Sequence, residues 1–168
     1  GKYVLDKPLM LTSDDGNDSK ELIIKNYPGE KTVLSSGIVL DLKWEKYKNG
    51  IMRAVVKGSP VMDMLFVNGE LKSMARYPNY DEKAVRFNGT SALATAPERV
   101  KKWKCPEGGY LHAMHKHDWG DFHYRITGKN EKGELQLEGG WQNNRPMGIH
   151  NENRMVENIF EELDAPGE

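Results

Sequence analysis

Cysteine is almost absent from this 168-residue chain, which contains only Cys105. One cysteine excludes an internal disulfide framework. No neighbouring group in the sequence would activate it as a nucleophile. An excess of charge of either sign is missing too, because 24 basic and 25 acidic residues leave a net charge of −1. A nucleic-acid-binding domain normally has a basic excess on one face, so we expect no nucleic-acid partner.

Long apolar runs and enzyme motifs are also missing. No stretch approaches the roughly 20 apolar residues of a membrane-spanning helix, so we predict no membrane span. The sequence contains no Gly-x-Ser-x-Gly, phosphate-binding loop or zinc-binding helix motif, and we predict no cofactor. With 38% hydrophobic and 29% charged residues, the chain has the composition of a folded protein with a core.

Short strand-forming runs dominate what is present. In the first 42 residues they are about ten residues apart and are separated by turn residues, at 3–5, 9–11, 22–25, 32–34 and 38–42. This spacing fits the coils of a β-helix and a β-sandwich equally well. Without a tight repeat, the sequence pattern alone does not choose between them.

Longer hairpins are predicted after residue 43. Asn49-Gly50 and Asn68-Gly69 are favoured type I′ turns. Strands are expected at 51–56, 62–67, 71–75, 110–114, 122–127 and 135–138. One short helix is predicted at 92–100, where Pro97 suits a first helical turn, and the apolar spacing from Val156 to Leu163 favours another.

The predicted fold class is therefore all-β. Residues 1–42 would form short β-helix-like edge strands. Residues 43–152 would form a compact antiparallel β-sandwich or barrel with one or two short helices. Residues 153–168 would be a return segment, unless the whole chain is one compact unit.

Three groups of residues are candidates for carbohydrate binding. Arg76, Tyr77 and Asn79 place a guanidinium, a phenol and an amide on a proline-stiffened loop, a mixture that suits sugar rings and hydroxyls. The alternative is a loop that covers a sheet edge with a solvated arginine. Trp119 and Trp141, in loops rich in Gly, Asn and Asp, could be sugar platforms or plugs at the end of a barrel, and Trp141 is the better binding candidate. Trp44 and Trp103 are expected to be core or staple residues.

Histidines form the third group, at 112, 115, 117 and 123. His115 and His117 would share one face of a strand, and this spacing also occurs in metal sites. A third ligand is not specified by the spacing, and imidazoles also pair with hydroxyls. We therefore favour a sugar-binding rim that includes His115 and His117, and predict no metal.

Catalytic carboxylates are not evident. Glycoside hydrolysis uses a pair of carboxyl groups, one with a raised pKa. The 25 acidic residues lie mostly in turns, and none combines a strand position with a neighbour that would raise its pKa. We predict no catalytic residue in this chain.

Three segments carry a family resemblance. Leu-Phe-Val-Asn-Gly followed by Ala-Arg-Tyr-Pro-Asn, at residues 65–79, resembles a motif of bacterial right-handed parallel β-helix proteins of glycoside-hydrolase type. Residues 3–37 resemble the early coils of those proteins, and residues 154–168 resemble the segment where the chain re-enters the β-helix. Both ends of the chain are expected to be cut sites within a longer protein.

The resemblance implies a function as well as a fold. It implies a secreted, periplasmic or cell-surface accessory domain that helps to shape a carbohydrate site, with the remainder of the parent β-helix as its partner. It assigns no sugar and transfers no catalytic residue. An autonomous carbohydrate-binding module and a purely structural insert are the alternatives.

Overall fold

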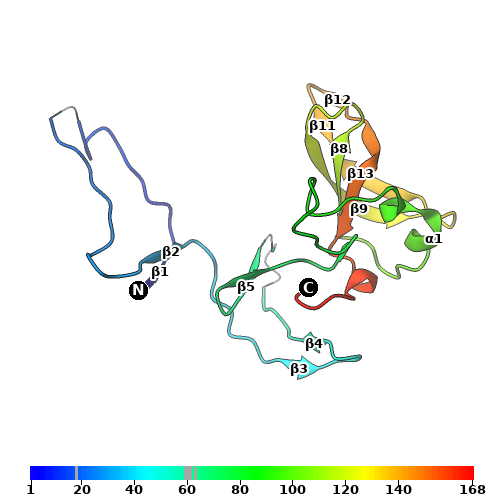
Figure 1. The fold of residues 1–168 in the computed structure, drawn as a ribbon, viewed down its shortest axis with the longest axis horizontal. Helices are drawn as coiled ribbons and strands as arrows, with labels where there is room; N and C mark the ends of the chain where they lie inside the picture. Colours follow the sequence, from blue (N-terminus) through cyan, green and yellow to red (C-terminus); the bar gives the residue numbers. More distant parts are fainter. Residues whose placement is uncertain (18, 59–61, 63) are drawn as a thin grey trace. The chain divides into compact units, whose positions relative to one another are not determined.

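The computed structural model describes residues 1–17, 19–58, 62 and 64–168. The chain divides into two units, residues 1–61 and residues 62–168. The all-β prediction is confirmed, since strands dominate, the helices are few and short, and the larger sheet is antiparallel and open (Figure 1). Among the described residues, no helix has the length and apolar character needed to cross a bilayer.

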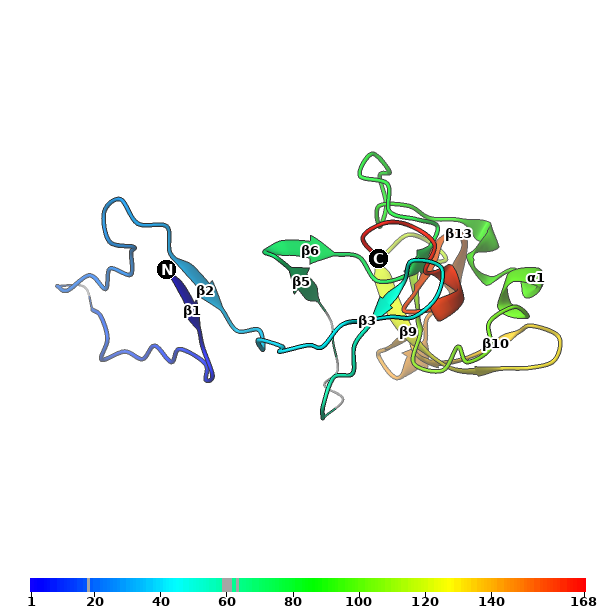
Figure 2. The same cartoon turned by 90° about the horizontal axis from the view of Figure 1, so that it is seen from below.

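The first unit contains two small sheets (Figure 2). Strand β1 (Lys2–Val4) pairs in parallel with β2 (Val33–Ser35). Strands β3 (Glu45–Lys46) and β4 (Met52–Arg53) form an antiparallel hairpin. The predicted Asn49-Gly50 turn is confirmed, because both residues have the positive φ angles, 52° and 80°, that a type I′ turn requires.

The first unit has no buried core. None of its described residues is buried, and large apolar side chains such as Met10, Ile24 and Ile38 are 75%, 61% and 75% exposed. The strands predicted at 9–11, 22–25 and 38–42 are wrong, since these segments form no ladder. A short apolar run becomes a strand only when a neighbour satisfies its backbone groups.

The second unit is built on a five-stranded antiparallel sheet, in the order β10-β9-β8-β13-β7. Its strands are β7 (Arg76–Tyr77), β8 (Tyr110–His115), β9 (Asp121–Lys129), β10 (Leu135–Gly139) and β13 (Ile149–Glu157). The strands predicted at 110–114, 122–127 and 135–138 are confirmed. Strand β13 also crosses the boundary that we placed at residue 152.

A separate hairpin precedes this sheet. Strands β5 (Leu65–Val67) and β6 (Glu70–Lys72) are joined by Asn68 and Gly69, whose φ angles are 53° and 85°. This second predicted type I′ turn is therefore confirmed. The strand predicted at 62–67 includes residue 63, which lies outside the described residues.

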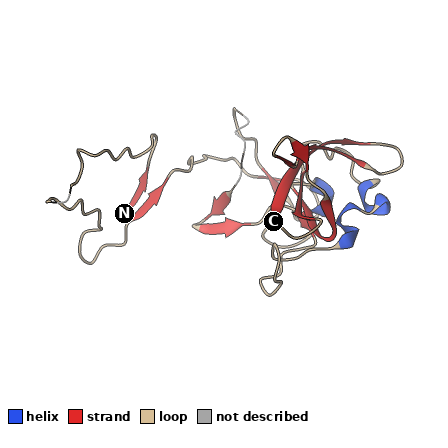
Figure 3. Cartoon of the chain, turned by 90° about the horizontal axis from the view of Figure 1, so that it is seen from above, coloured by secondary structure: helices blue, strands red, loops and turns tan. Residues whose placement is uncertain are grey.

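The core of the second unit follows from alternation along the central strands. Leu111 and Ala113 of β8 and Ile126 of β9 are at most 1% exposed, as expected when one face of a sheet is covered. Two short helices, η1 (Ala92–Thr95) and α1 (Pro97–Val100), supply the cover, in place of the one helix predicted at 92–100 (Figure 3). Trp103, also predicted in the core, is 1% exposed.

Two predictions outside this core are wrong. Trp44 is 53% exposed, because its unit has no core to receive it. The helix predicted at 156–163 is replaced by the end of β13 and a 3₁₀ turn, η2 (Phe160–Glu162). Val156 pairs with Leu111 on one side and Tyr77 on the other, so tertiary pairing overrides the helical spacing.

Candidate functional site

The seven predicted binding residues lie in three places in the second unit. Arg76 and Tyr77 lie in and beside the core, and Asn79 lines one pocket. His115, His117 and Trp119 line a second pocket, and Trp141 lies on the hairpin that borders it.

The buried side chain of Arg76 holds a loop together through hydrogen bonds to its carbonyls. It is 5% exposed, and its Nε donates to the carbonyl of Pro78 (2.9 Å). Its Nη2 donates to the carbonyls of Phe87 (2.8 Å) and Gly89 (2.9 Å). Burial lowers the pKa of Arg76, but these carbonyls satisfy the cation. The guanidinium is thus used to close the loop of residues 78–89.

Tyr77 belongs to a second structural cluster. The guanidinium carbon of Arg99 lies 3.2 Å from the centre of the Tyr77 ring, a cation–π contact. Arg99 also pairs with buried Glu162 at 2.6 Å. The other carboxylate oxygen of Glu162 accepts from Trp103 Nε1 at 2.6 Å. This network fixes the end of the chain against the core.

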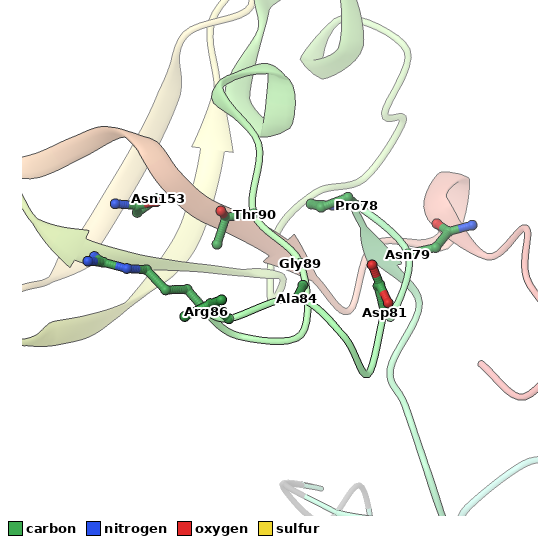
Figure 4. Close-up of a pocket in the computed structure, with 9 residues that line it drawn as sticks. Pro78, Asn79, Asp81, Ala84, Arg86, Gly89, Thr90 and Asn153 are labelled. Atoms are coloured by element: carbon green, nitrogen blue, oxygen red, sulfur yellow. The ribbon is translucent and has the colours of Figure 1, made fainter.

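The first pocket, the Pro78 pocket, has a volume of about 520 Å³. The loop that follows β7 supplies most of the lining, and Asn153 of β13 contributes from another element (Figure 4). Its lining residues are Pro78, Asn79, Asp81, Ala84, Val85, Arg86, Gly89, Thr90 and Asn153.

Internal partners hold several polar groups of the Pro78 pocket. Arg86 forms an ion pair with Asp118 at 2.6 Å, which lowers the pKa of that carboxyl. Asn79 donates to Asp164 at 3.1 Å. Asp81 accepts from the amide of Lys83 at 2.9 Å. The pocket is polar but presents no aromatic face among its lining residues.

The second pocket, the Trp119 pocket, has a volume of about 280 Å³. The end of β8, the following turn and the chain around β12 form its walls. Its lining residues are His115, Lys116, His117, Trp119, Arg145, Pro146, Met147 and Gly148. This pocket therefore brings together three of the seven predicted residues.

A tight turn presents Trp119. The amide of His115 donates to the carbonyl of Gly120 (2.7 Å), and the amide of Asp118 donates back to the carbonyl of His115 (2.8 Å). Asp118 has a φ of 58°, a left-handed conformation that aspartate tolerates better than most residues. His117 thus lies in the turn, beyond the end of β8 at His115, rather than on the strand where we expected it.

The ring of His115 supports the Trp119 indole by stacking on it. It is 4% exposed, and its ring stacks on Trp119 with centres 4.8 Å apart and planes inclined by 14°. Its Nδ1 accepts from the amide of His117 at 3.2 Å. Burial, followed by the positive charges of His117, Lys116 and Arg145, lowers the pKa of His115. Trp119 itself stays 75% exposed.

Trp141 is presented by a hairpin of β11 (Trp141–Gln142) and β12 (Arg145–Pro146). The two-residue turn is Asn143-Asn144, with φ angles of 52° and 59°. Trp141 lies opposite Pro146, a lining residue of the Trp119 pocket, and is 65% exposed.

Two contacts anchor this hairpin to the sheet. The amide of Met147 donates to the carbonyl of Gly140 (2.7 Å), and the Tyr124 hydroxyl donates to the carbonyl of Met147 (3.2 Å). Gly140 has a φ of 67°, and the Tyr124 ring occupies the space that any Cβ would need. Glycine is therefore required where the chain leaves the sheet to form the hairpin.

Sequence reasoning missed Lys116 and Arg145. Both line the Trp119 pocket; Lys116 lies between His115 and His117, and Arg145 lies on the same hairpin as Trp141. Their positions, one between two histidines and the other directly after an Asn-Asn turn, were the available signals.

The remaining histidines form a separate cluster. His112 and His123 are cross-strand neighbours with ring centres 3.9 Å apart, and Phe87 stacks on His112 at the same distance. His112 Nε2 lies 2.5 Å from Asp121, but burial has the larger effect and lowers its pKa. Within the described part of the chain, no three His, Cys, Asp or Glu residues are grouped to hold a metal ion.

No protein-family model, curated protein or solved structure matches this chain.

Proposed function

We propose that this chain is a non-catalytic carbohydrate-binding domain, and that the Trp119 pocket is its binding site. One observation carries the proposal. Trp119 is three-quarters exposed yet stacks on buried His115, at a pocket that is also lined by polar side chains.

Sugars match this combination of surfaces. The C–H groups of a pyranose ring pack on an exposed indole face, and its hydroxyls need donors and acceptors around that face. His117 lies beside the indole, with ring centres 5.5 Å apart, and Lys116 and Arg145 complete the polar rim. Trp141 supplies a second exposed indole on the bordering hairpin, which would contact a neighbouring sugar unit.

Preorganisation strengthens the case for Trp119. Because one face of the indole stacks on His115, much of its rotamer freedom is lost before a ligand arrives. A platform held in this way costs less conformational entropy on binding. An exposed tryptophan without such support would pay that cost at each binding event.

Hydrolysis is not part of the proposal. A glycosidase needs two carboxyl groups across the scissile bond. The lining of the Trp119 pocket contains no aspartate or glutamate, and in the Pro78 pocket the one lining carboxylate, Asp81, accepts from the main chain of its own loop.

The proposal also includes an accessory role beside a parallel β-helix. Parallel sheets are normally covered on both faces, but β1 and β2 form a parallel pair with exposed Tyr3, Val33 and Leu34. A further coil of parallel strands would supply both missing backbone partners and apolar cover. We expect proteolysis to cleave residues 1–61 readily in this chain and slowly when parallel coils flank it; equal cleavage would argue against this arrangement.

Tryptophan fluorescence tests the binding proposal. The chain is titrated against a panel of plant and host oligosaccharides, with Trp119→Ala and Trp141→Ala as test variants and Trp44→Ala as the control. We expect a saturable shift with one sugar class. Affinity should fall about tenfold or more for Trp119→Ala, which corresponds to ~1.4 kcal/mol, and should stay unchanged for Trp44→Ala.

The alternative is a structural insert. It predicts a flat response to every sugar while circular dichroism shows the chain to be folded. That result would reject the carbohydrate-binding proposal.

A further inference from the structure

The charged residues that line the Trp119 pocket are basic. Lys116, Arg145 and His117 line it together with buried His115, and none of its described lining residues is acidic. Lys116 and Arg145 form no ion pair with any residue that the structure describes. Among the described residues, these two cationic side chains therefore have no acidic partner.

The nearest acidic residue in sequence, Asp118, has other partners. It pairs with Arg86 at 2.6 Å and accepts from Asn153 Nδ2 at 3.5 Å. It also lies 3.8 Å from His150 Nε2. These contacts involve residues outside the lining of the Trp119 pocket, so Asp118 is not placed to neutralise Lys116 or Arg145.

Local backbone contacts fix the positions from which the side chains of Lys116 and Arg145 extend. The amide of Lys116 donates to the carbonyl of Gly148 at 2.8 Å. Any Cβ on Gly148 would collide with the methylene chain of Lys116, so glycine leaves the room that this chain occupies. Arg145 opens β12 directly after the Asn143-Asn144 turn and pairs with Gln142 across the hairpin.

The neighbouring imidazole responds to this concentration of charge. Burial has the largest effect on the pKa of His115 and lowers it, and the nearby His117, Lys116 and Arg145 lower it further. The cationic side chains thus influence the same small volume, in which an anionic group would find favourable electrostatics.

We infer that the Trp119 pocket binds an acidic glycan, with a carboxylate or sulfate group on Lys116 and Arg145 and the sugar ring on Trp119. This inference rests on the proposed carbohydrate-binding function and adds the substrate class. Guanidinium pairs with carboxylate or sulfate oxygens through two parallel N–H donors, and lysine adds a mobile point charge. The indole adds a stacking contact with the sugar ring, which a free inorganic anion would not make.

Three oligosaccharide probes test the substrate class. They share a galactose-type ring: galacturonate oligomers carry carboxylates, carrageenan oligomers carry sulfates, and galactan oligomers are neutral. We expect at least one acidic probe to bind about tenfold more tightly than the neutral one. The preferred acidic probe identifies which anionic group the pocket takes.

Salt dependence provides a second readout. Raising ionic strength from about 0.01 M to about 0.15 M shortens the Debye length from ~30 Å to ~8 Å. Acidic-glycan binding should weaken several-fold over this range, because Lys116 and Arg145 are exposed to solvent. Binding that depended on ring stacking alone would change little.

Charge-removing variants connect the effect to the pocket. In the double variant Lys116→Gln/Arg145→Gln, affinity for the acidic probe should fall to about that for the neutral probe, so the preference should be lost. The control Arg125→Gln/Lys132→Gln removes the same net charge at exposed positions outside the pocket, and should retain the preference.

The outcomes separate the two proposals. Equal affinity for acidic and neutral probes, with loss on Trp119→Ala, would overturn the acidic-glycan inference and leave the carbohydrate proposal standing. An acidic preference that survives Lys116→Gln/Arg145→Gln would also overturn it. No binding of any probe by the folded chain would overturn both.

Discussion

Residues 1–61 and 62–168 both contain short strands and Asn-Gly turns, but they differ in what they bury. The first unit has no buried residue among those described, and it contains 18 of the 30 exposed large hydrophobic residues of the described chain. The second unit encloses Trp103, Leu111 and Ile126 at 1% exposure or less. Similar local structure therefore coexists with very different amounts of hydrophobic stabilisation.

The difference shows what a turn can and cannot do. A type I′ turn fixes the register of two strands from local residues alone. An isolated two-stranded hairpin is nevertheless marginal in water. The β3–β4 hairpin remains without a core, whereas β8 and β9 join three further strands and short helices that cover one face.

Hydrogen exchange would give the largest contrast between the units. Amides in the centres of β8, β9 and β13 should be protected about 10⁴-fold or more, which corresponds to ~5.5 kcal/mol of opening free energy. Amides in residues 1–61 should exchange within about tenfold of the unfolded rate. Equal protection in β1 and β8 would contradict the contrast drawn here.

Matched tryptophan truncations should separate the units energetically. Trp103→Ala removes a buried indole and the donor to Glu162, and should destabilise the chain by about 3–5 kcal/mol. Trp44→Ala, at a half-exposed position in the first unit, should change stability by less than about 0.5 kcal/mol. Urea denaturation followed by circular dichroism measures both. A large effect of Trp44→Ala would reveal a core around that residue.

Substitutions of the neighbouring residues Glu162 and Glu161 test the buried network of the second unit. Glu162→Gln removes the negative charge that accepts hydrogen bonds from Arg99 and Trp103. We expect the free energy of unfolding to fall by about 1.5–3 kcal/mol. The control is the adjacent Glu161→Gln, which keeps an oxygen for the Lys104 amide and should cost less than about 0.5 kcal/mol. Equal thermal stability of the two variants would show that the buried carboxylate contributes no more than its exposed neighbour.

Mild acid should produce the smallest effect, confined to the second unit, which contains all five histidines. Burial lowers the pKa of His112 and His115 in the folded chain, so the unfolded chain binds more protons below its ordinary histidine pKa of about 6.5. Stability should therefore fall as the pH drops from about 7.5 to about 5.5.

Thermal melts across this pH range would measure the effect. The variant His112→Gln/His115→Gln should show a shallower decrease in melting temperature. An increase in stability on acidification would mean that the contact of His112 with Asp121 outweighs burial.

Local chemistry made part of the fold predictable. Both Asn-Gly turns were correct, because positive φ at two successive residues is a property of those residues themselves. The helix predicted at 156–163 failed because strand pairing on both sides of Val156 is a tertiary effect. The strands predicted at 9–11 and 22–25 failed for the opposite reason, since no described segment pairs with them.

The candidate site was predictable to a similar degree. His115, His117 and Trp119 are close in sequence, so one turn was enough to bring them to one pocket. The burial of Arg76 depends on carbonyls as distant in sequence as Phe87 and Gly89, and no local pattern reports that. Arg145 lines the Trp119 pocket from another hairpin, so its position beside His115 and Trp119 is visible only in the folded chain.

The turn after β8 also separates two tasks along the backbone. Asp118 holds Arg86 of the loop that forms the Pro78 pocket, while the residues on either side of it, His117 and Trp119, line the other pocket. A structural contact and the proposed binding contacts thus fall on alternate residues of one short segment. If the proposed site binds sugars, substitutions at positions 117 and 119 would change its ligand preference, while Asp118 would keep its ion pair with Arg86.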